Sequence, residues 1–141
     1  MMVLVDTPIW SLALRRRPID LSASERLITN TLSGLVRQRR IRLLGPTRQE
    51  VLSGIRDESQ FLRIRDHLRG FANVELDASD YEEAARANNR CRGKGVAGSP
   101  VDLLICAVAL RYGWQIFTTD HDFERYRSVL DIRLYLPSKP N

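Results

Sequence analysis

Five carboxylates lie where the sequence predicts that buried strands end or that helices begin. They are Asp6, Glu50, Asp102, Asp120 and Asp122. Carboxylates that converge on a half-buried crevice repel one another strongly, because the local dielectric constant is low. A divalent cation removes that repulsion, and Mg²⁺ and Mn²⁺ prefer oxygen ligands of this kind. The acids therefore suggest a site for a hard divalent cation.

Each acid also has an explanation that needs no metal. Thr47 and Glu50 have the spacing of a helix capping box, and so do Ser99 and Asp102. Asp120 could cap the helix that follows it, and an acid in a first helical turn favours the helix dipole. These acids nevertheless open onto apolar elements, and their joint placement favours the metal site over capping.

Two neighbouring features are interpreted without a metal. Ser79 and Glu82 have the same capping-box spacing but begin a polar helix, so we expect a plain cap there. His121 lies between Asp120 and Asp122. Consecutive helical residues diverge by about 100°, so the three side chains cannot all face one ion, and His121 is not expected to be a ligand.

The elements that must position the acids alternate between strands and helices. Strands are expected at residues 2–5, 41–45, 114–118 and 132–136, with a brief strand or an extended connector at 74–76. Helices are expected from Pro8 onward and at 22–38, 46–55, 59–71, 79–92, 100–113 and 120–130. This order predicts an α/β fold with a central parallel sheet of four to five strands flanked by helices. Ligands of such sheets bind outside the carboxyl ends of the strands, where the acids fall.

The composition suits a soluble protein that binds a polyanion. The length of 141 residues predicts a single domain, 1–141. The net charge is +5, and every basic residue except Lys94 and Lys139 is arginine, which makes bidentate contacts with phosphate. Two clusters supply the candidate nucleic-acid-binding residues, which are Arg15, Arg16, Arg17, Arg39 and Arg40.

The cysteines and the apolar runs bear on the compartment. Cys91 lies in a polar stretch and Cys106 in an apolar run, so they form neither a disulfide framework nor a zinc motif. The longest apolar run, residues 103–110, is too short to span a bilayer. We therefore expect a cytoplasmic protein that has no membrane partner.

Four segments of the chain resemble the four sequence blocks of PIN-domain ribonucleases, most nearly the VapC-type toxins of bacterial toxin–antitoxin pairs. They are VLVDTPIW, RQEVLSGI, SPVDLLICAVALRYG and IFTTDHDFERY, in the order typical of that family. The resemblance implies a PIN-like three-layer sandwich and a nuclease that cuts RNA with Mg²⁺ or Mn²⁺. It also implies a cognate antitoxin and a homodimer.

The resemblance assigns roles by position. Asp6, Glu50, Asp102 and Asp120 match the core catalytic and metal-binding acids, and Asp122 matches a further, more variable metal ligand. Thr7 and Thr118 match small hydroxyl residues beside the acids. Pro8 departs from the family, in which a small polar residue is common at that position.

Three other readings remain open from the residues. A PIN-like protein could hold RNA or a partner without cutting, although the full acid set argues against this. A phospho-acceptor receiver domain would pair a central aspartate with a lysine late in the sheet, and only Lys94 and Lys139 are present. A nuclease that acts on DNA would have the same acids.

Overall fold

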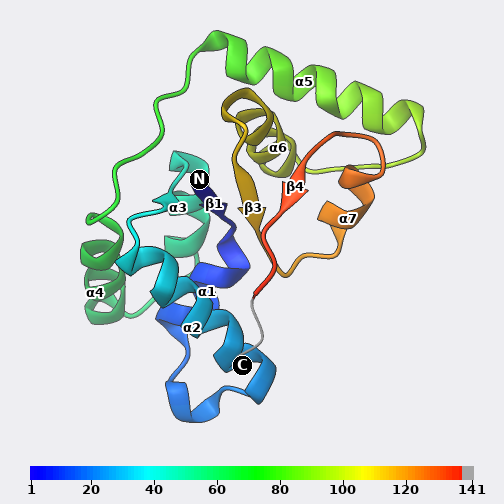
Figure 1. Cartoon of the computed structure of the whole chain (residues 1–141). Helices are drawn as coiled ribbons and strands as arrows, with labels where there is room; N and C mark the ends of the chain where they lie inside the picture. Colours follow the sequence, from blue (N-terminus) through cyan, green and yellow to red (C-terminus); the bar gives the residue numbers. More distant parts are fainter. Residues whose placement is uncertain (138–141) are drawn as a thin grey trace.

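The computed structural model describes residues 1–137, so Lys139 lies outside the described part of the chain. Four short strands form one sheet (Figure 1): β1 (Val3–Val5), β2 (Ile41–Arg42), β3 (Gln115–Phe117) and β4 (Arg133–Leu134). Seven α-helices surround it: α1 (Thr7–Arg15), α2 (Ala23–Arg37), α3 (Gly45–Leu52), α4 (Glu58–Leu68), α5 (Ala78–Gly93), α6 (Pro100–Tyr112) and α7 (Asp122–Arg127). None of the helices in residues 1–137 has both the length and the apolar character needed to cross a membrane.

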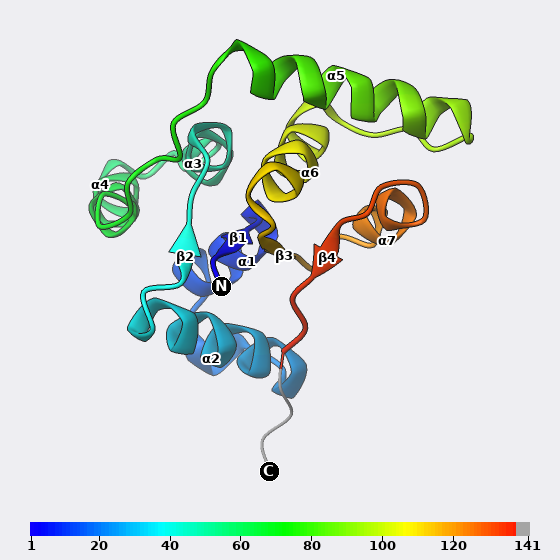
Figure 2. The same cartoon turned by 45° about the horizontal axis from the view of Figure 1, so that its top comes forward.

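The sheet is buried on both faces, as is usual for parallel sheets. Successive strand residues point to opposite faces. Leu4 and Ile116 pack with α5, α6 and α7, whereas Val5 and Phe117 pack with α1, α2, α3 and α4. Figure 2 shows α5 and α6 on one side of the sheet and α1 and α2 on the other. The predicted three-layer α/β sandwich with a parallel sheet is confirmed.

The sheet has a topological switch point between its two central strands, β1 and β3, because strands are added on opposite sides of β1. The strand order is β2-β1-β3-β4, and all three pairings are parallel. The connection from β1 leads to β2 at one edge, and the next strand, β3, lies on the opposite side of β1. Open α/β sheets bind ligands at such a switch point, outside the carboxyl ends of the strands. Asp6 follows β1 there, and its backbone N–H donates to the Phe117 carbonyl of β3 at 2.9 Å.

The structure decides one predicted element and shortens another. Residues 74–76 form the extended connector, which was one of the two alternatives, and not the brief strand, and Asn73 pairs with Leu43 in an isolated parallel bridge. The strand predicted at 41–45 is shorter, because helix α3 already begins at Gly45 and leaves only Ile41–Arg42 in the sheet.

The predicted capping box of Ser79 and Glu82 is wrong. The residue that caps α5 is Asp77, two positions before Ser79, and the capping box is formed by Asp77 and Asp80. The Asp80 N–H donates to Asp77 Oδ1 at 3.3 Å, and the Asp77 N–H donates to Asp80 Oδ2 at 3.0 Å. Arg111 of α6 holds both oxygens of Asp80 at 2.8 Å, so a tertiary contact selects this box. Glu82 is exposed.

The link between α5 and α6 leaves no room for a side chain at Gly98. A Cβ there would collide with Leu103 and would lie 2.9 Å from the Tyr126 ring. We expect Gly98→Ala to lower the free energy of unfolding by about 1–3 kcal/mol, the usual effect of overpacking. Urea denaturation measures it. Gly93→Ala is the control, because a Cβ at Gly93 meets nothing within 4 Å. Equal unfolding midpoints for the two variants would contradict this packing.

Candidate active site

Asp6 is held rigidly at the switch point. It is only 4% exposed, and each carboxylate oxygen accepts one hydrogen bond. The Thr7 N–H donates to Oδ1 at 2.9 Å, and the Thr118 hydroxyl donates to Oδ2 at 2.8 Å. The Thr118 hydroxyl in turn accepts from the Asp120 N–H at 3.0 Å. These bonds join the end of β1 to the end of β3 and fix the orientation of the Asp6 carboxylate.

Asp102 reaches the same edge from the first turn of α6. Ser99 caps that helix, since its hydroxyl accepts from the Asp102 N–H at 3.1 Å. The reciprocal half of the predicted capping box is replaced, because the Asp102 carboxylate instead accepts from the Tyr126 hydroxyl at 2.7 Å. The carboxylate is therefore directed by a tertiary contact with α7, and one of its oxygens is free of that contact.

Glu50 has no capping role, so the capping explanation for this acid is wrong. The residue that precedes α3 is Leu44, which makes no side-chain cap bond, and a proline lies at the first helical positions. Thr47 is therefore inside the helix and is 1% exposed. Glu50 lies on α3 as an exposed residue whose carboxyl is electrostatically coupled to Asp102.

Asp120 and Asp122 follow β3 in a tight turn. Asp120 Oδ1 accepts from the Asp122 N–H at 2.9 Å, so Asp120 does support the start of α7. The N-cap position itself is His121, which makes no side-chain cap bond. One carboxylate oxygen from each of Asp102, Asp120 and Asp122 lies within 4.8 Å of the other two. Thus capping and clustering occur together at Asp120.

Burial and the charges of neighbouring acids raise the pKa values of Asp6 and Asp102. The pKa of Asp6 is raised to about 6: burial is the largest cause, the bonds from Thr118 and Thr7 lower the pKa, and the charges of Asp102 and Glu50 raise it. Burial, and then the charges of the neighbouring acids, likewise raise the pKa of Asp102.

Glu50 belongs to the same electrostatic group. Loss of water around its carboxyl, and then the charge of Asp102, raise the pKa of Glu50 even though the residue as a whole is exposed. Asp102 is therefore the common member: its charge acts on Asp6 and Glu50, and the charges of Asp120 and Asp122 act on it.

The donor set fits a hard divalent cation. Ligand oxygens on opposite sides of an Mg²⁺ ion are separated by about 4.2 Å, because each lies about 2.1 Å from the ion. One oxygen from each of Asp102, Asp120 and Asp122 lies within 4.8 Å of the other two, so side-chain rotations could bring all three oxygens to one ion. Asp6 and Glu50 do not belong to this trio, but both carboxyls are electrostatically coupled to Asp102 and are the further candidate oxygen donors.

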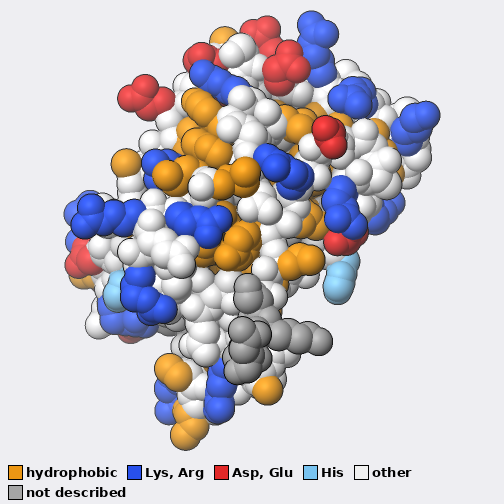
Figure 3. Space-filling model, viewed as in Figure 1, with side chains coloured by type: hydrophobic (Ala, Val, Ile, Leu, Met, Phe, Trp, Pro, Cys, Tyr) orange, Lys and Arg blue, Asp and Glu red, His pale blue; other side chains and the backbone are white. Residues whose placement is uncertain are grey.

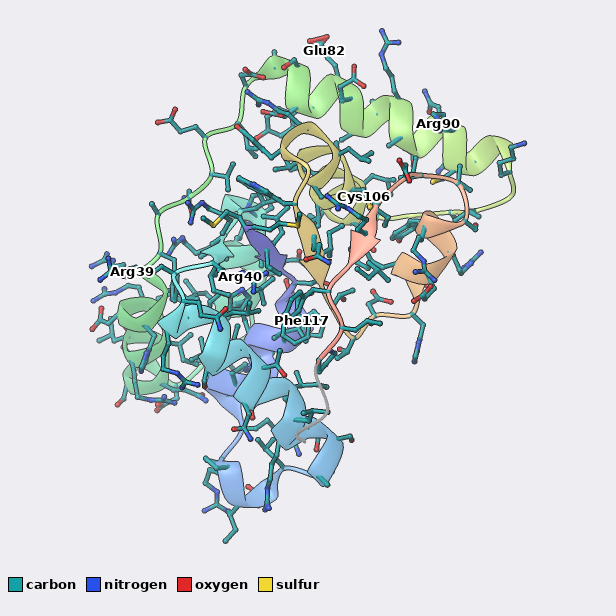
Figure 4. The ribbon with its side chains drawn as sticks, viewed as in Figure 1. Arg39, Arg40, Glu82, Arg90, Cys106 and Phe117 are labelled. Carbon is teal, nitrogen blue, oxygen red and sulfur yellow. The ribbon has the colours of Figure 1, made fainter. Side chains whose placement is uncertain are left out.

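The candidate arginines divide between two ends of the molecule. Arg15 ends α1, which begins directly after Asp6, and it lines a surface groove of about 480 Å³ with Arg16. Arg17 lies 3.1 Å from the Asp20 carboxylate. Arg39 and Arg40, by contrast, immediately precede β2 and so lie at the amino ends of the strands (Figure 4). Only Arg15 lies on the helix that leaves the acidic edge, and Arg16 and Arg17 directly follow that helix.

Tyr126 is the residue that sequence reasoning missed. Its side chain is buried at 1% exposure, yet its hydroxyl is bonded to Asp102. Burial, followed by the bond to and the charge of Asp102, raises the pKa of the Tyr126 phenol above its ordinary value. It therefore remains a proton donor at neutral pH. Phe123 and Tyr126 have the spacing of a buried helix face, which indicates packing. The only sequence signal for a further role is the Tyr126 hydroxyl, because a buried hydroxyl needs a hydrogen-bond partner.

The fold agrees with the comparisons to known proteins. The PIN domain family model matches residues 3–129, and the chain belongs to this family. Ribonuclease VapC11 of Mycobacterium tuberculosis and VapC ribonuclease Mb1587 of Mycobacterium bovis are each 29% identical to it over 136 residues. The alignments cover 94% of this chain and 96% of each relative.

Solved structures share the fold. FitAcB from Neisseria gonorrhoeae superposes with a TM-score of 0.75 at 19% identity, over 96% of this chain and 98% of that chain. VapBC2 from Rickettsia felis, bound to a promoter DNA fragment, superposes with a TM-score of 0.67 at 15% identity, over 96% and 98% of the two chains. The predicted PIN-like architecture is confirmed.

The raised pKa of Asp6 predicts a pH dependence for the metal-free protein in EDTA. Its pKa rises from 3.8 to about 6 on folding, so the folded state binds more protons between these values. The stability of the parent therefore falls as the pH rises through this range. Asp6→Asn lacks this titration, so the stability difference between variant and parent should grow by about 2–3 kcal/mol from pH 4 to pH 6.5. Urea denaturation in EDTA measures it. A difference that stays constant with pH would show that Asp6 ionises freely.

Proposed function

We propose that this chain is a metal-dependent endoribonuclease of the VapC type that hydrolyses RNA phosphodiester bonds. The observation that carries the proposal is the convergence of acids on Asp102 at the switch point of a PIN fold. Relatives that match nearly the whole chain are named ribonucleases, which supports RNA as the substrate. In this proposal Asp6, Glu50, Asp102 and Asp120 are the catalytic acids.

Mg²⁺ or Mn²⁺ is the proposed cofactor. Asp102, Asp120 and Asp122 would hold it, with Asp6 and Glu50 completing the set. When bound, the cation supplies an acidified water and neutralises charge on the phosphoryl oxygens. The chain itself orients the acids: Thr7 and Thr118 each donate to one oxygen of Asp6, and Tyr126 donates to one oxygen of Asp102, which leaves the second Asp102 oxygen and the remaining lone pairs for the cation.

The proposal includes the partners expected of such a toxin. The solved structures that share this fold include VapBC2 of Rickettsia felis and FitAB bound to a DNA fragment, which supports a cognate antitoxin for this chain. We also propose a homodimer that works in the cytoplasm. Both cysteines are buried and free, which suits a reducing compartment.

Removing single charges from the acidic edge tests the nuclease. Glu50→Gln should leave stability nearly unchanged, because Glu50 makes no cap bond. A neutral amide is a poor Mg²⁺ ligand, so cleavage of RNA should fall by about two orders of magnitude or more. Asp120→Asn should behave alike, because an amide oxygen can still accept from the Asp122 N–H. The assay is RNA cleavage with Mg²⁺, with thermal melts of each variant.

Glu82→Gln is the matched control for Glu50→Gln. It removes the same charge from an exposed position of α5, far from the acidic edge (Figure 4). Its cleavage rate and melting temperature should equal those of the parent. If Glu50→Gln and Asp120→Asn cut RNA at the parent rate, the nuclease assignment is wrong. A parent that binds RNA without cutting it would instead be a non-catalytic PIN-like binding protein.

Metal binding is tested apart from activity by Tyr126→Phe. Millimolar Mn²⁺ should stabilise the parent by about 2.7 kcal/mol at 100 times its dissociation constant, and EDTA should reverse the gain. Losing the bond that orients Asp102 should weaken Mn²⁺ binding about 10–100-fold in titration calorimetry, the usual effect of removing a partner of a metal ligand. Tyr81→Phe, at an exposed position of α5, is the control. If the Mn²⁺ affinity of Tyr126→Phe equals that of the parent, Tyr126 has only a packing role.

A further inference from the structure

A second basic surface lies away from the acidic edge, at the amino ends of the strands. It is a pocket of about 860 Å³, here called the amino-edge pocket, whose lining includes Arg39, Arg42, His67, Phe71, Tyr112 and Trp114. The view in Figure 3 shows arginine side chains around exposed hydrophobic side chains, and Figure 4 places Arg39 and Arg40 beside α4 and β2. The site proposed for catalysis uses none of these residues.

One wall of the amino-edge pocket carries a preformed aromatic stack. Helix α6 ends at Gly113, whose φ of 69° reverses the chain and brings Trp114 alongside Tyr112. The two rings are nearly parallel, at 14°, and their centroids are 4.3 Å apart. The Arg111 guanidinium lies 4.8 Å from the Tyr112 centroid, and Tyr112 remains 41% exposed. Because Trp114 already stacks on Tyr112 and the Arg111 guanidinium lies over the same ring, a base that stacks there must displace the guanidinium, but the ring itself needs no further ordering.

The lining of the amino-edge pocket also carries positive charge without local compensation. No residue that lines the amino-edge pocket is acidic. Within residues 1–137, neither Arg39 nor Arg42 lies within ion-pair distance of a carboxylate, whereas Arg125 and Arg127 of α7 each pair with an acid of their own helix. Arg39 has a φ of 55°, a conformation that costs free energy for arginine. The fold thus retains an uncompensated arginine pair at an energetic cost.

We propose that the amino-edge pocket binds nucleotides of the RNA substrate that lie outside the cleavage site. A flat ring beside unpaired guanidiniums matches a base with its phosphate, and such stacking is tolerant of base identity. An acidic peptide would use the charge but not the stacked platform, so nucleic acid is the better match. The inference rests on the proposed nuclease function.

The amino-edge pocket and the acidic edge lie at opposite ends of the strands. The strands have three residues or fewer, so about 10 Å of strand separates the two sites.

The test compares binding of a fluorescein-labelled 12-nucleotide RNA and a 4-nucleotide RNA to protein that carries Asp120→Asn, so that neither RNA is cut. The pocket variant is Arg39→Asp with Arg42→Glu, because aspartate tolerates a positive φ better than glutamate. The control is Arg86→Glu with Arg90→Glu on α5, which makes the same change in net charge (Figure 4). Tyr112→Leu removes the exposed ring and leaves the charge unchanged.

We expect the pocket variant to bind the 12-nucleotide RNA at least tenfold more weakly than the control variant, and Tyr112→Leu to lose several-fold. The slope of log affinity against log salt should become shallower by about 0.7 for each lost phosphate contact. In protein with Asp120 intact, the KM for the long RNA should rise while the kcat for the short RNA stays unchanged. Thermal melts verify that each variant is folded, and Tyr112→Leu alone tests the pocket if the charge variant does not fold.

The outcomes separate this proposal from the nuclease assignment. Equal losses in the pocket and control variants would show a general charge effect and overturn the pocket. Unchanged binding of the long RNA in both the pocket variant and Tyr112→Leu would also overturn the pocket. That result would not contradict the nuclease assignment if the parent cuts RNA. If the parent binds RNA through the pocket but does not cut it, the pocket proposal is supported and the nuclease assignment is wrong.

Discussion

Repulsion among the carboxylates around Asp102 is the constraint that the surrounding structure must satisfy. The charges of Asp120 and Asp122 raise the pKa of Asp102, and the charge of Asp102 raises the pKa values of Asp6 and Glu50. Burial further raises the free energy of ionising Asp102 and Asp6. A fold selected only for stability would replace some of these acids with neutral side chains. Their retention at a topological switch point, with oxygens already close together, is what a cation-binding edge requires.

The donors that hold these acids come from distant parts of the chain. Thr118 reaches Asp6 across 112 positions, and Tyr126 reaches Asp102 from a separate helix. Neither bond can form before β3 lies beside β1 and α7 packs against α6. Assembly of the site is therefore coupled to closure of the whole sandwich, and Gly98 matters because it admits Tyr126 to its position.

The sequence predicted the local part of this arrangement and missed the part that depends on tertiary contacts. Apolar runs followed by acids located the carboxyl ends of β1 and β3, so Asp6 and Asp120 could be placed together in advance. The spacing of Thr47 and Glu50 misled, because a proline starts α3 earlier and buries Thr47 inside it. The role of Tyr126 depends on a long-range contact, which no spacing in the sequence encodes.

The direction of the strands also separates the functions of the arginines. Arg15 follows the acidic edge along α1, whereas Arg39 precedes β2 and lies at the opposite edge. In the proposed nuclease, an acidic edge repels RNA unless a cation neutralises it, so affinity for the polyanion would come from basic groups elsewhere on the surface. Arg125, whose guanidinium lies 3.9 Å from the Asp122 carboxylate, is the described arginine that could compete with the cation there, whereas Arg39 and Arg42 make no such ion pair. The same separation allows binding of RNA and its cleavage to be altered independently by substitution.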